Sequence, residues 1–278
     1  MSFFEKLDLE KKLNIFTGNF FQQSSDLPSR ANISTILTNQ FKFKNLGEIH
    51  DSCSLFEVSQ CFVDDVISTR DGLLKKLQGI YEYKKGNQTF LESLVNSNVV
   101  ASIINTNYDS SFEENANVFK ATPFSDLDSP DGRIRLYKVF GDLSDLESCV
   151  ITKQDFRKLK LLPFYKLFWD SIRCELKVRN SIFLGIDLED SDFFEFIEFL
   201  LEGCSEDVKP MYFVTSKSVL DPKIIEFFNK YKIKLLVSNE YEFFKGLHSF
   251  LEGDSKIELE KLFPVENQTV MLEKKSLS

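Results

Sequence analysis

Two polar residues, Asn107 and Asp109, come directly after the apolar run 99–104. A short apolar run that ends in turn-forming residues is typical of a buried parallel strand. In open α/β sheets, ligands bind in the crevice just beyond the carboxyl ends of such strands. This position predicts that Asn107 and Asp109 hold the sugar of a nucleotide. The alternative is that both residues only cap the next helix and turn.

A second candidate element is the glycine turn after the first predicted strand. The run 13–16 leads into Gly18 and a polar segment. A glycine at such a turn lets the backbone approach a pyrophosphate, and a following helix N-terminus supplies N–H donors. We therefore predict a phosphate-binding turn at Gly18. An ordinary strand–turn–helix corner would have the same pattern. Gly185, which follows a later predicted strand, fits a tight turn.

The elements that would position these residues alternate between strand and helix. Regular alternation predicts a parallel, doubly wound α/β sheet that is connected by right-handed crossovers. We expect one such domain over residues 1–252, with a helical insertion at about 31–98 and a polar tail at 253–278. We also expect a helix to start at Ser110–Glu114 and a loop over 117–133. The predicted strands lie at 13–16, 99–104, 134–140, 181–184, 210–215 and 231–237, and the later helices at 165–173, 192–201, 222–230 and 240–251.

Composition and charge narrow the class of protein. The formal net charge is −9 and the pI is near 5.0, which argues against general binding to nucleic acid or to a membrane surface. No apolar run reaches the ~20 residues of a membrane span, and the acidic N-terminal residues do not fit a signal peptide. Five scattered cysteines without a Cys-x-x-Cys pair indicate reduced thiols in a cytoplasmic protein, with no zinc site.

Several segments resemble, in order and spacing, the sirtuin-like family of NAD-consuming proteins, in particular its bacterial NAD-hydrolase branch. The resemblance implies a Rossmann-like fold with NAD as cofactor. It also implies Asn107 and Asp109 as catalytic residues, and Gly18, Pro28, Asn107, Asp109, Gly185 and Asp187 as cofactor-binding residues. The matching segments are Gly18 with Leu27-Pro28, Asn107-Tyr108-Asp109, Lys138 with Gly141-Asp142, and Gly185.

The chain departs from the family pattern at three positions. Phe140 stands where the family places its catalytic histidine, the general base of the reaction, and a phenyl ring cannot accept a proton. Phe20 replaces the second glycine of the phosphate loop, and Asp26 replaces the glycine before Leu-Pro. The only histidines, His50 and His248, fall in predicted helices elsewhere in the chain.

Three functions remain open on this basis. The first is a degenerate sirtuin-like domain that no longer turns over NAD and acts as a scaffold or regulatory subunit, with a protein partner or as a homo-oligomer. The second is an active NAD hydrolase of anti-phage defence, in which Asn107 and Asp109 act by positioning alone. The third is a module that senses NAD or a related nucleotide without cleaving it. Phe193, Phe194, Phe196 and Phe199 cover more than one face of the predicted helix 192–201, which also suggests an outer face on which a partner helix docks.

Overall fold

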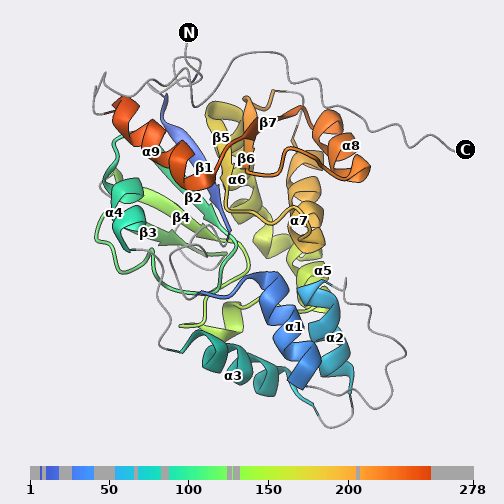
Figure 1. Ribbon diagram of the computed structural model, residues 1–278. Helices are drawn as coiled ribbons and strands as arrows, with labels where there is room; N and C mark the ends of the chain where they lie inside the picture. The colour runs from blue at the N-terminus through green and yellow to red at the C-terminus, as the bar shows by residue number, and fades with distance from the viewer. Residues whose placement is uncertain are drawn as a thin grey trace, which may run out of the picture.

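The strands form one parallel sheet. The computed structural model describes residues 7, 11–18, 27–40, 54–65, 68–82, 88–123, 127, 132–204 and 207–251. Within them the sheet has seven strands in the order β3-β4-β2-β1-β5-β6-β7 (Figure 1). Every neighbouring pair is parallel, which confirms the predicted doubly wound α/β fold. The strands are β1 (Leu13–Thr17), β2 (Val100–Asn105), β3 (Val118–Ala121), β4 (Ile134–Lys138), β5 (Asn180–Leu184), β6 (Met211–Thr215) and β7 (Ile233–Val237).

Helices cover both faces of the sheet, so most strand side chains are buried and the strands appear in the sequence as apolar runs. The α-helices are α1 (Arg30–Gln40), α2 (Leu55–Asp64), α3 (Arg70–Tyr81), α4 (Gln88–Asn96), α5 (Lys153–Leu161), α6 (Lys166–Val178), α7 (Ser191–Glu202), α8 (Pro222–Lys230) and α9 (Glu240–Leu251). Two short 3-10 helices, η5 (Leu146–Ser148) and η6 (Pro163–Tyr165), lie in the connections before α5 and α6.

Each face of the sheet has its own hydrophobic core. On one face, Leu94 of α4 and Phe243 of α9 pack over inward side chains of the strands such as Ile103. On the other face, α6, α7 and α8 contribute aromatic rings to a larger cluster that includes Phe196. Ring contacts continue from strand to helix, for example between Phe183 of β5 and the rings of α7. The high phenylalanine content therefore serves mainly as packing.

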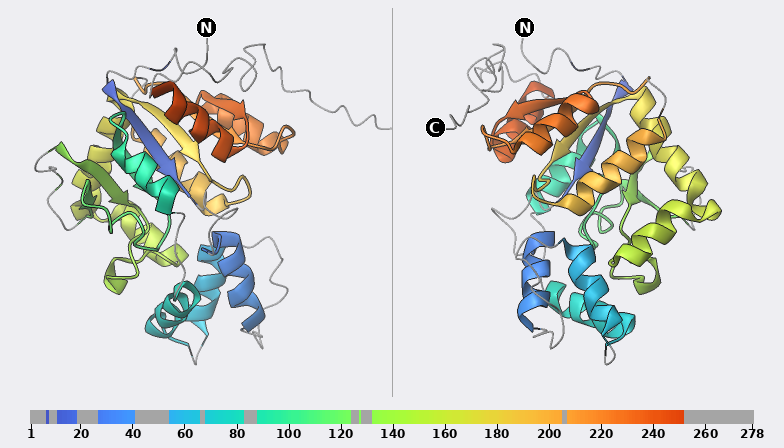
Figure 2. Two further views of the ribbon diagram at one scale, coloured as in Figure 1. Left: turned by 60° about the vertical axis from the view of Figure 1, so that its left-hand side comes forward. Right: turned by 90° about the vertical axis from the view of Figure 1, so that its right-hand side faces the viewer.

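Helices α1, α2 and α3 form a separate layer below the sheet, on the side of the carboxyl ends of its strands (Figures 1 and 2). Side-chain caps fix the first residues of two helices in this layer, α2 and α3. The Ser54 hydroxyl accepts a hydrogen bond from the N–H of Glu57 at the start of α2, and Thr69 caps α3 in the same way. Helix α4, by contrast, lies against the sheet. The boundaries of an insertion at about 31–98 remain a prediction, and the predicted tail 253–278 lies outside the described residues.

Two local predictions are wrong. Residues 118–121 of the expected loop 117–133 form β3, the strand next to β4 at one end of the sheet order. This strand is too short to give a clear period in the sequence. Ser110–Glu114 forms turns rather than a helix, with the Glu113 N–H donating to the Ser110 carbonyl at 3.2 Å. Among the described helices, none combines the length and apolarity that crossing a bilayer requires.

Candidate functional site

The strand order reverses at β1, because β2 to β4 lie on one side of β1 and β5 to β7 on the other. The carboxyl ends at such a switch point are where doubly wound folds bind ligands. Asn107 lies there and is buried. Its Nδ2 donates to the Gly18 carbonyl at 2.8 Å, and its backbone N–H donates to Oδ1 of Asn105 at 3.1 Å. The Oδ1 atom of Asn107 has no hydrogen-bond partner in the described part of the chain.

Gly18 and Gly185 meet at the same switch point. A Cβ atom on Gly18 would lie 2.5 Å from the Gly185 carbonyl oxygen, so only glycine fits where the loops after β1 and β5 cross. Gly185 itself has a φ of +63°, the left-handed region that favours glycine. Chain crossing and backbone conformation therefore account for both glycines. The predicted contacts of Gly18 with a pyrophosphate and of Gly185 with the cofactor stay predictions, and Phe20 and Asp26 of the first loop lie outside the described residues.

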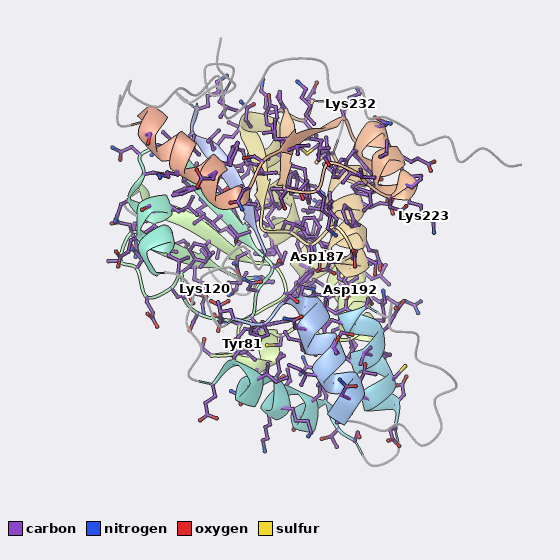
Figure 3. All side chains as sticks on the ribbon, viewed as in Figure 1. Tyr81, Lys120, Asp187, Asp192, Lys223 and Lys232 are labelled. Carbon is purple, nitrogen blue, oxygen red and sulfur yellow. The ribbon has the colours of Figure 1, made fainter. Side chains whose placement is uncertain are left out.

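The two predicted aspartates are each engaged in their own loop. Asp109 Oδ1 accepts a hydrogen bond from the Ser111 N–H at 3.0 Å, and Asp187 Oδ1 accepts one from the Glu189 N–H at 3.0 Å. Asp187 is exposed, and Figure 3 places it between the sheet and the helical layer. Pro28 is buried just before α1. The structure thus brings together Asn107, Gly18 and Gly185, whereas the side chains of both aspartates stabilise local turns.

Phe140, at the position of the expected histidine, is completely buried. Its ring packs edge-on against Phe56 of α2 and Phe196 of α7, with centroids 5.2 and 5.4 Å away. Its backbone carbonyl accepts a hydrogen bond from the Val150 N–H at 2.9 Å. Gly141 next to it has a φ of +83°, and a Cβ there would lie 2.2 Å from the Ser148 carbonyl oxygen. The segment is therefore fixed with the phenyl ring inside the core.

Arg30, the first residue of α1, lies over the Phe140 ring with its Cζ 4.7 Å from the ring centre. The same guanidinium is 4.6 Å from the centre of Phe56. It donates hydrogen bonds to Asp190 Oδ2 at 2.9 Å, to Asp192 Oδ2 at 2.8 Å and to the Tyr108 hydroxyl at 3.1 Å. Burial alone would lower the pKa of Arg30, but the neighbouring carboxylates outweigh it and keep the group charged.

Asp192 extends this ion cluster to two more helices. Its Oδ2 accepts the backbone N–H of Phe56 at 3.0 Å, at the start of α2, and its Oδ1 accepts Lys153 Nζ of α5 at 3.2 Å. Figure 3 shows Asp192 between the sheet and the helical layer. We refer to Arg30, Asp190, Asp192 and Lys153 as the Arg30 cluster. It joins α1, α2, α5 and α7, with Arg30 and Asp192 buried and with Asp190 and Lys153 partly exposed.

Sequence reasoning did not identify the Arg30 cluster. One local signal was present, because a cation in the first turn of a helix opposes the helix dipole and so suggests a specific acidic partner. The partners themselves were not identifiable, since they lie 160 and 162 positions further along the chain.

Two cavities flank the candidate site. The larger, of about 650 Å³, is lined by the first turns of α1, α2 and α8 and by the segment before α7, with Arg30 and Asp190 in its wall. The smaller, of about 190 Å³, lies beyond β3 and β4 and is lined by Lys138 and Asp142, among others. In the described part of the chain, no group of three or more His, Cys, Asp or Glu side chains is arranged to hold a metal ion.

Lys138, which matches the family motif, is a buried lysine beside the smaller cavity. Its Nζ donates to Asn105 Oδ1 at 3.2 Å and to the Asp109 carbonyl, and lies 3.5 Å from Glu113 Oε1. Burial raises the pKa of Glu113 to about 7, although Lys138 counteracts the shift. Lys138 thereby links the ends of β2 and β4 on the side away from Gly18.

The comparisons with known proteins agree with this fold. Residues 101–236 match the family model of the SIR2-like domain, a segment that runs from β2 to the end of β7. No curated protein matches the chain. The matched segment contains Asn107, Phe140 and Gly185, so the predicted family is confirmed. Residues 101–236, just under half of the chain, are therefore similar to a SIR2-like domain, which supports the predicted place of the chain in the sirtuin-like family.

Proposed function

We propose that this SIR2-like domain does not turn over NAD and acts as a scaffold or regulatory subunit. The observation that carries the proposal is the environment of Phe140. The ring fills the position of the family's general base, is completely buried, and stacks against a guanidinium that two aspartates hold in place. An imidazole could not reach a substrate from this position without displacing packed aromatic side chains.

Among the described residues next to the Phe140 ring, none of Arg30, Tyr108 and Asp190 replaces the missing base. Arg30 stays protonated at every physiological pH. Burial raises the pKa of Tyr108 far above neutrality, and its hydroxyl donates to the Val150 carbonyl at 2.8 Å. Asp190 is bound to Arg30 at 2.9 Å and lies within the Arg30 cluster. None of these three described side chains is therefore suited to take a proton from a ribose hydroxyl or a water, and loss of such a base costs about 100- to 10,000-fold in rate.

The buried phenyl ring of Phe140 cannot supply the proton transfer that cleavage of the nicotinamide bond uses in this family. The alternative of an active hydrolase would rest on Asn107 and Asp109 alone, and the Asp109 side chain is already engaged by the Ser111 N–H. A scaffold role implies a protein partner, and the scattered cysteines favour the cytoplasm as its compartment. The resemblance to the bacterial branch suggests that the setting is anti-phage defence.

One observation favours a second candidate, a module that binds NAD or a related nucleotide without cleaving it. The buried Oδ1 of Asn107 has no partner in the described part of the chain, and a buried acceptor of this kind usually finds a donor. A sugar hydroxyl would supply one. The cavity of about 650 Å³ beside Arg30 also has the size of ordinary ligand sites.

The test measures free nicotinamide after the purified protein is incubated with NAD, with the Phe140→His variant in parallel. We expect no turnover from either protein, because in the variant the imidazole is enclosed by the same aromatic rings and Arg30. Turnover by the wild type would overturn both proposals. Calorimetry separates them: NAD binding that Asn107→Ala abolishes without loss of folding selects the nucleotide-binding module, and absence of binding selects the scaffold.

A further inference from the structure

Four large apolar side chains are exposed at the connection between α5 and α6. Leu161 is 66 % exposed, Leu162 39 %, Phe164 49 % and Leu167 72 %. We call these four residues the α5–α6 tip. Single exposed leucines are common on protein surfaces, but a contiguous apolar patch indicates an interaction site. The right-hand view of Figure 2 shows α5 and α6 along one edge of the molecule, where a partner has access.

The tip is not needed to complete the hydrophobic core. Phe156 and Leu159 of α5 and Phe168 and Trp169 of α6 are the buried anchors of this helix pair. The indole Nε1 of Trp169 donates to the Leu159 carbonyl at 3.0 Å and fixes the two helices together. These inward residues determine the helix positions. The exposed side chains of Leu161, Leu162 and Leu167 therefore contribute little to the fold and are accessible to another molecule, and the half-exposed Phe164 packs on Tyr165 with ring centroids 4.1 Å apart.

The charge around the tip is opposite in sign to that of the whole chain. Residues 157–167 contain Arg157, Lys158, Lys160 and Lys166 and no acidic residue, whereas the chain has a net charge of −9. Lys160 and Lys166 each contact an acidic side chain, Glu195 and Asp170 respectively. Arg157 and Lys158 are exposed beside the apolar patch. Cations around an apolar centre are complementary to an acidic partner with its own apolar stripe.

The outer face of α6 continues the patch. Leu167, Cys174 and Val178 are all exposed and are spaced by seven and four residues, so they lie in one row along the helix. This spacing is the one at which a second helix packs lengthwise. We propose that an acidic amphipathic helix of a partner protein docks along the α5–α6 tip and the outer row of α6. The inference holds whether or not the chain cleaves NAD.

Two other occupants are less well matched. A second copy of this chain on the same patch would bring Lys158 and Lys166 close to their own counterparts across a two-fold axis, which is repulsive. An anionic membrane would attract the tip but repel a chain with a net charge of −9. The helix 192–201, which by sequence alone was a candidate for docking, has its outer rings covered, because Phe194 packs on Phe227 of α8 and Phe199 on Trp169.

The probe is a pair of designed fluorescent peptides with identical leucine rows, one with glutamates and one with lysines at all other positions. Fluorescence anisotropy compares their binding to the full chain at 150 mM salt. Three variants are tested: Leu161→Ser with Leu167→Ser removes apolar area, Lys158→Ser with Lys166→Ser removes charge, and Val219→Ser is the matched control. Val219 is 74 % exposed and lies outside this surface, so its loss tests unspecific adhesion. All five substituted positions are exposed, and we expect unchanged thermal stability.

We expect the glutamate peptide to bind at least ten times more tightly than the lysine peptide. Both double variants should bind the glutamate peptide at least tenfold more weakly than the wild type does, and Val219→Ser should bind it as tightly as the wild type. Hydrogen exchange should slow in residues 157–178 when the peptide is bound. Equal binding of both peptides, or binding that none of the variants changes, would overturn the proposal. The proposal would also be overturned if the glutamate peptide did not bind and the chain instead formed a dimer, or sedimented with phosphatidylserine vesicles, in a way that Leu161→Ser with Leu167→Ser abolished.

Discussion

Replacement of Arg30 by methionine tests whether the Arg30 cluster stabilises the helical layer. Methionine keeps an unbranched apolar chain over Phe56 and Phe140 but removes the charge and all three hydrogen bonds. Asp192, which is completely buried, then loses one of its two cations. Burial raises the pKa of Asp190, and the variant loses Arg30, the group that counteracts this rise most strongly.

The expected loss follows from this geometry. Breaking a buried ion pair by removing one partner costs about 3–5 kcal/mol, because a carboxylate is left without its counter-charge. Lys153 stays 3.2 Å from Asp192 Oδ1, so we expect the lower end, about 3 kcal/mol. For a chain of this size that corresponds to a fall in Tm of about 6–12 °C.

Urea unfolding followed by circular dichroism measures the free energy of unfolding of wild type and variant. Lys217→Met is the matched control, because it removes an exposed cation whose Nζ lies 3.0 Å from Glu189. That control should cost less than ~1 kcal/mol. A loss below ~1 kcal/mol for Arg30→Met as well would refute the reasoning, because it would mean that the aspartates find other compensation.

The pH dependence of the Arg30→Met loss provides an independent check. Burial already raises the pKa of Asp190 in the wild type, and the loss of Arg30 should raise it further above the unfolded value of ~3.9. An acid with a raised folded pKa destabilises the protein above the unfolded pKa, and this penalty disappears as the group is protonated at lower pH. The difference between variant and wild type should therefore shrink from pH 7.5 to pH 5. A constant difference would contradict the assignment to unpaired carboxylates.

Two further predictions concern single positions. In urea unfolding, Gly18→Ala should lower the free energy of unfolding by about 1–3 kcal/mol, because its Cβ would lie 2.5 Å from the Gly185 carbonyl oxygen. Gly79 lies inside α3, where a Cβ would meet no described atom within 4 Å outside the helix's own backbone. Gly79→Ala should therefore raise the free energy of unfolding by about 0.5–1 kcal/mol. Since burial raises the folded pKa of Glu113 from 4.5 to about 7, wild-type stability should decrease as pH rises across this window. Glu113→Gln should then be more stable than wild type at pH 8, by about 1–3 kcal/mol, with little difference near pH 4.5; equal stability at pH 8 would disprove the shift.

Local patterns were sufficient for most of the fold. Helices α8 and α9 have the predicted bounds, 222–230 and 240–251, because a proline starts the first and both carry clear helical periods. The parallel strands were recognisable because both of their faces are buried and so are apolar. β3 was missed because it has four residues and only two of them are buried.

Local sequence patterns predicted only part of the candidate site. The replacement at Phe140 was evident from the sequence, since its neighbours match the family motif. What surrounds Phe140 was not, because Arg30, Phe56 and Phe196 come from three different helices. The roles of Gly18 and Gly185 likewise depend on a crossing of two loops more than 160 residues apart.

The sequence by itself determined the alternation of strands and helices, the sirtuin-like order of motifs and the loss of the histidine, since each of these is written in neighbouring residues. Only the tertiary structure decided that a buried arginine stacks on the replacement ring and binds Asp190 and Asp192. The physical reason is that the stability of a buried charge depends on partners that folding brings within 3 Å, and their separation along the chain carries no information about that distance.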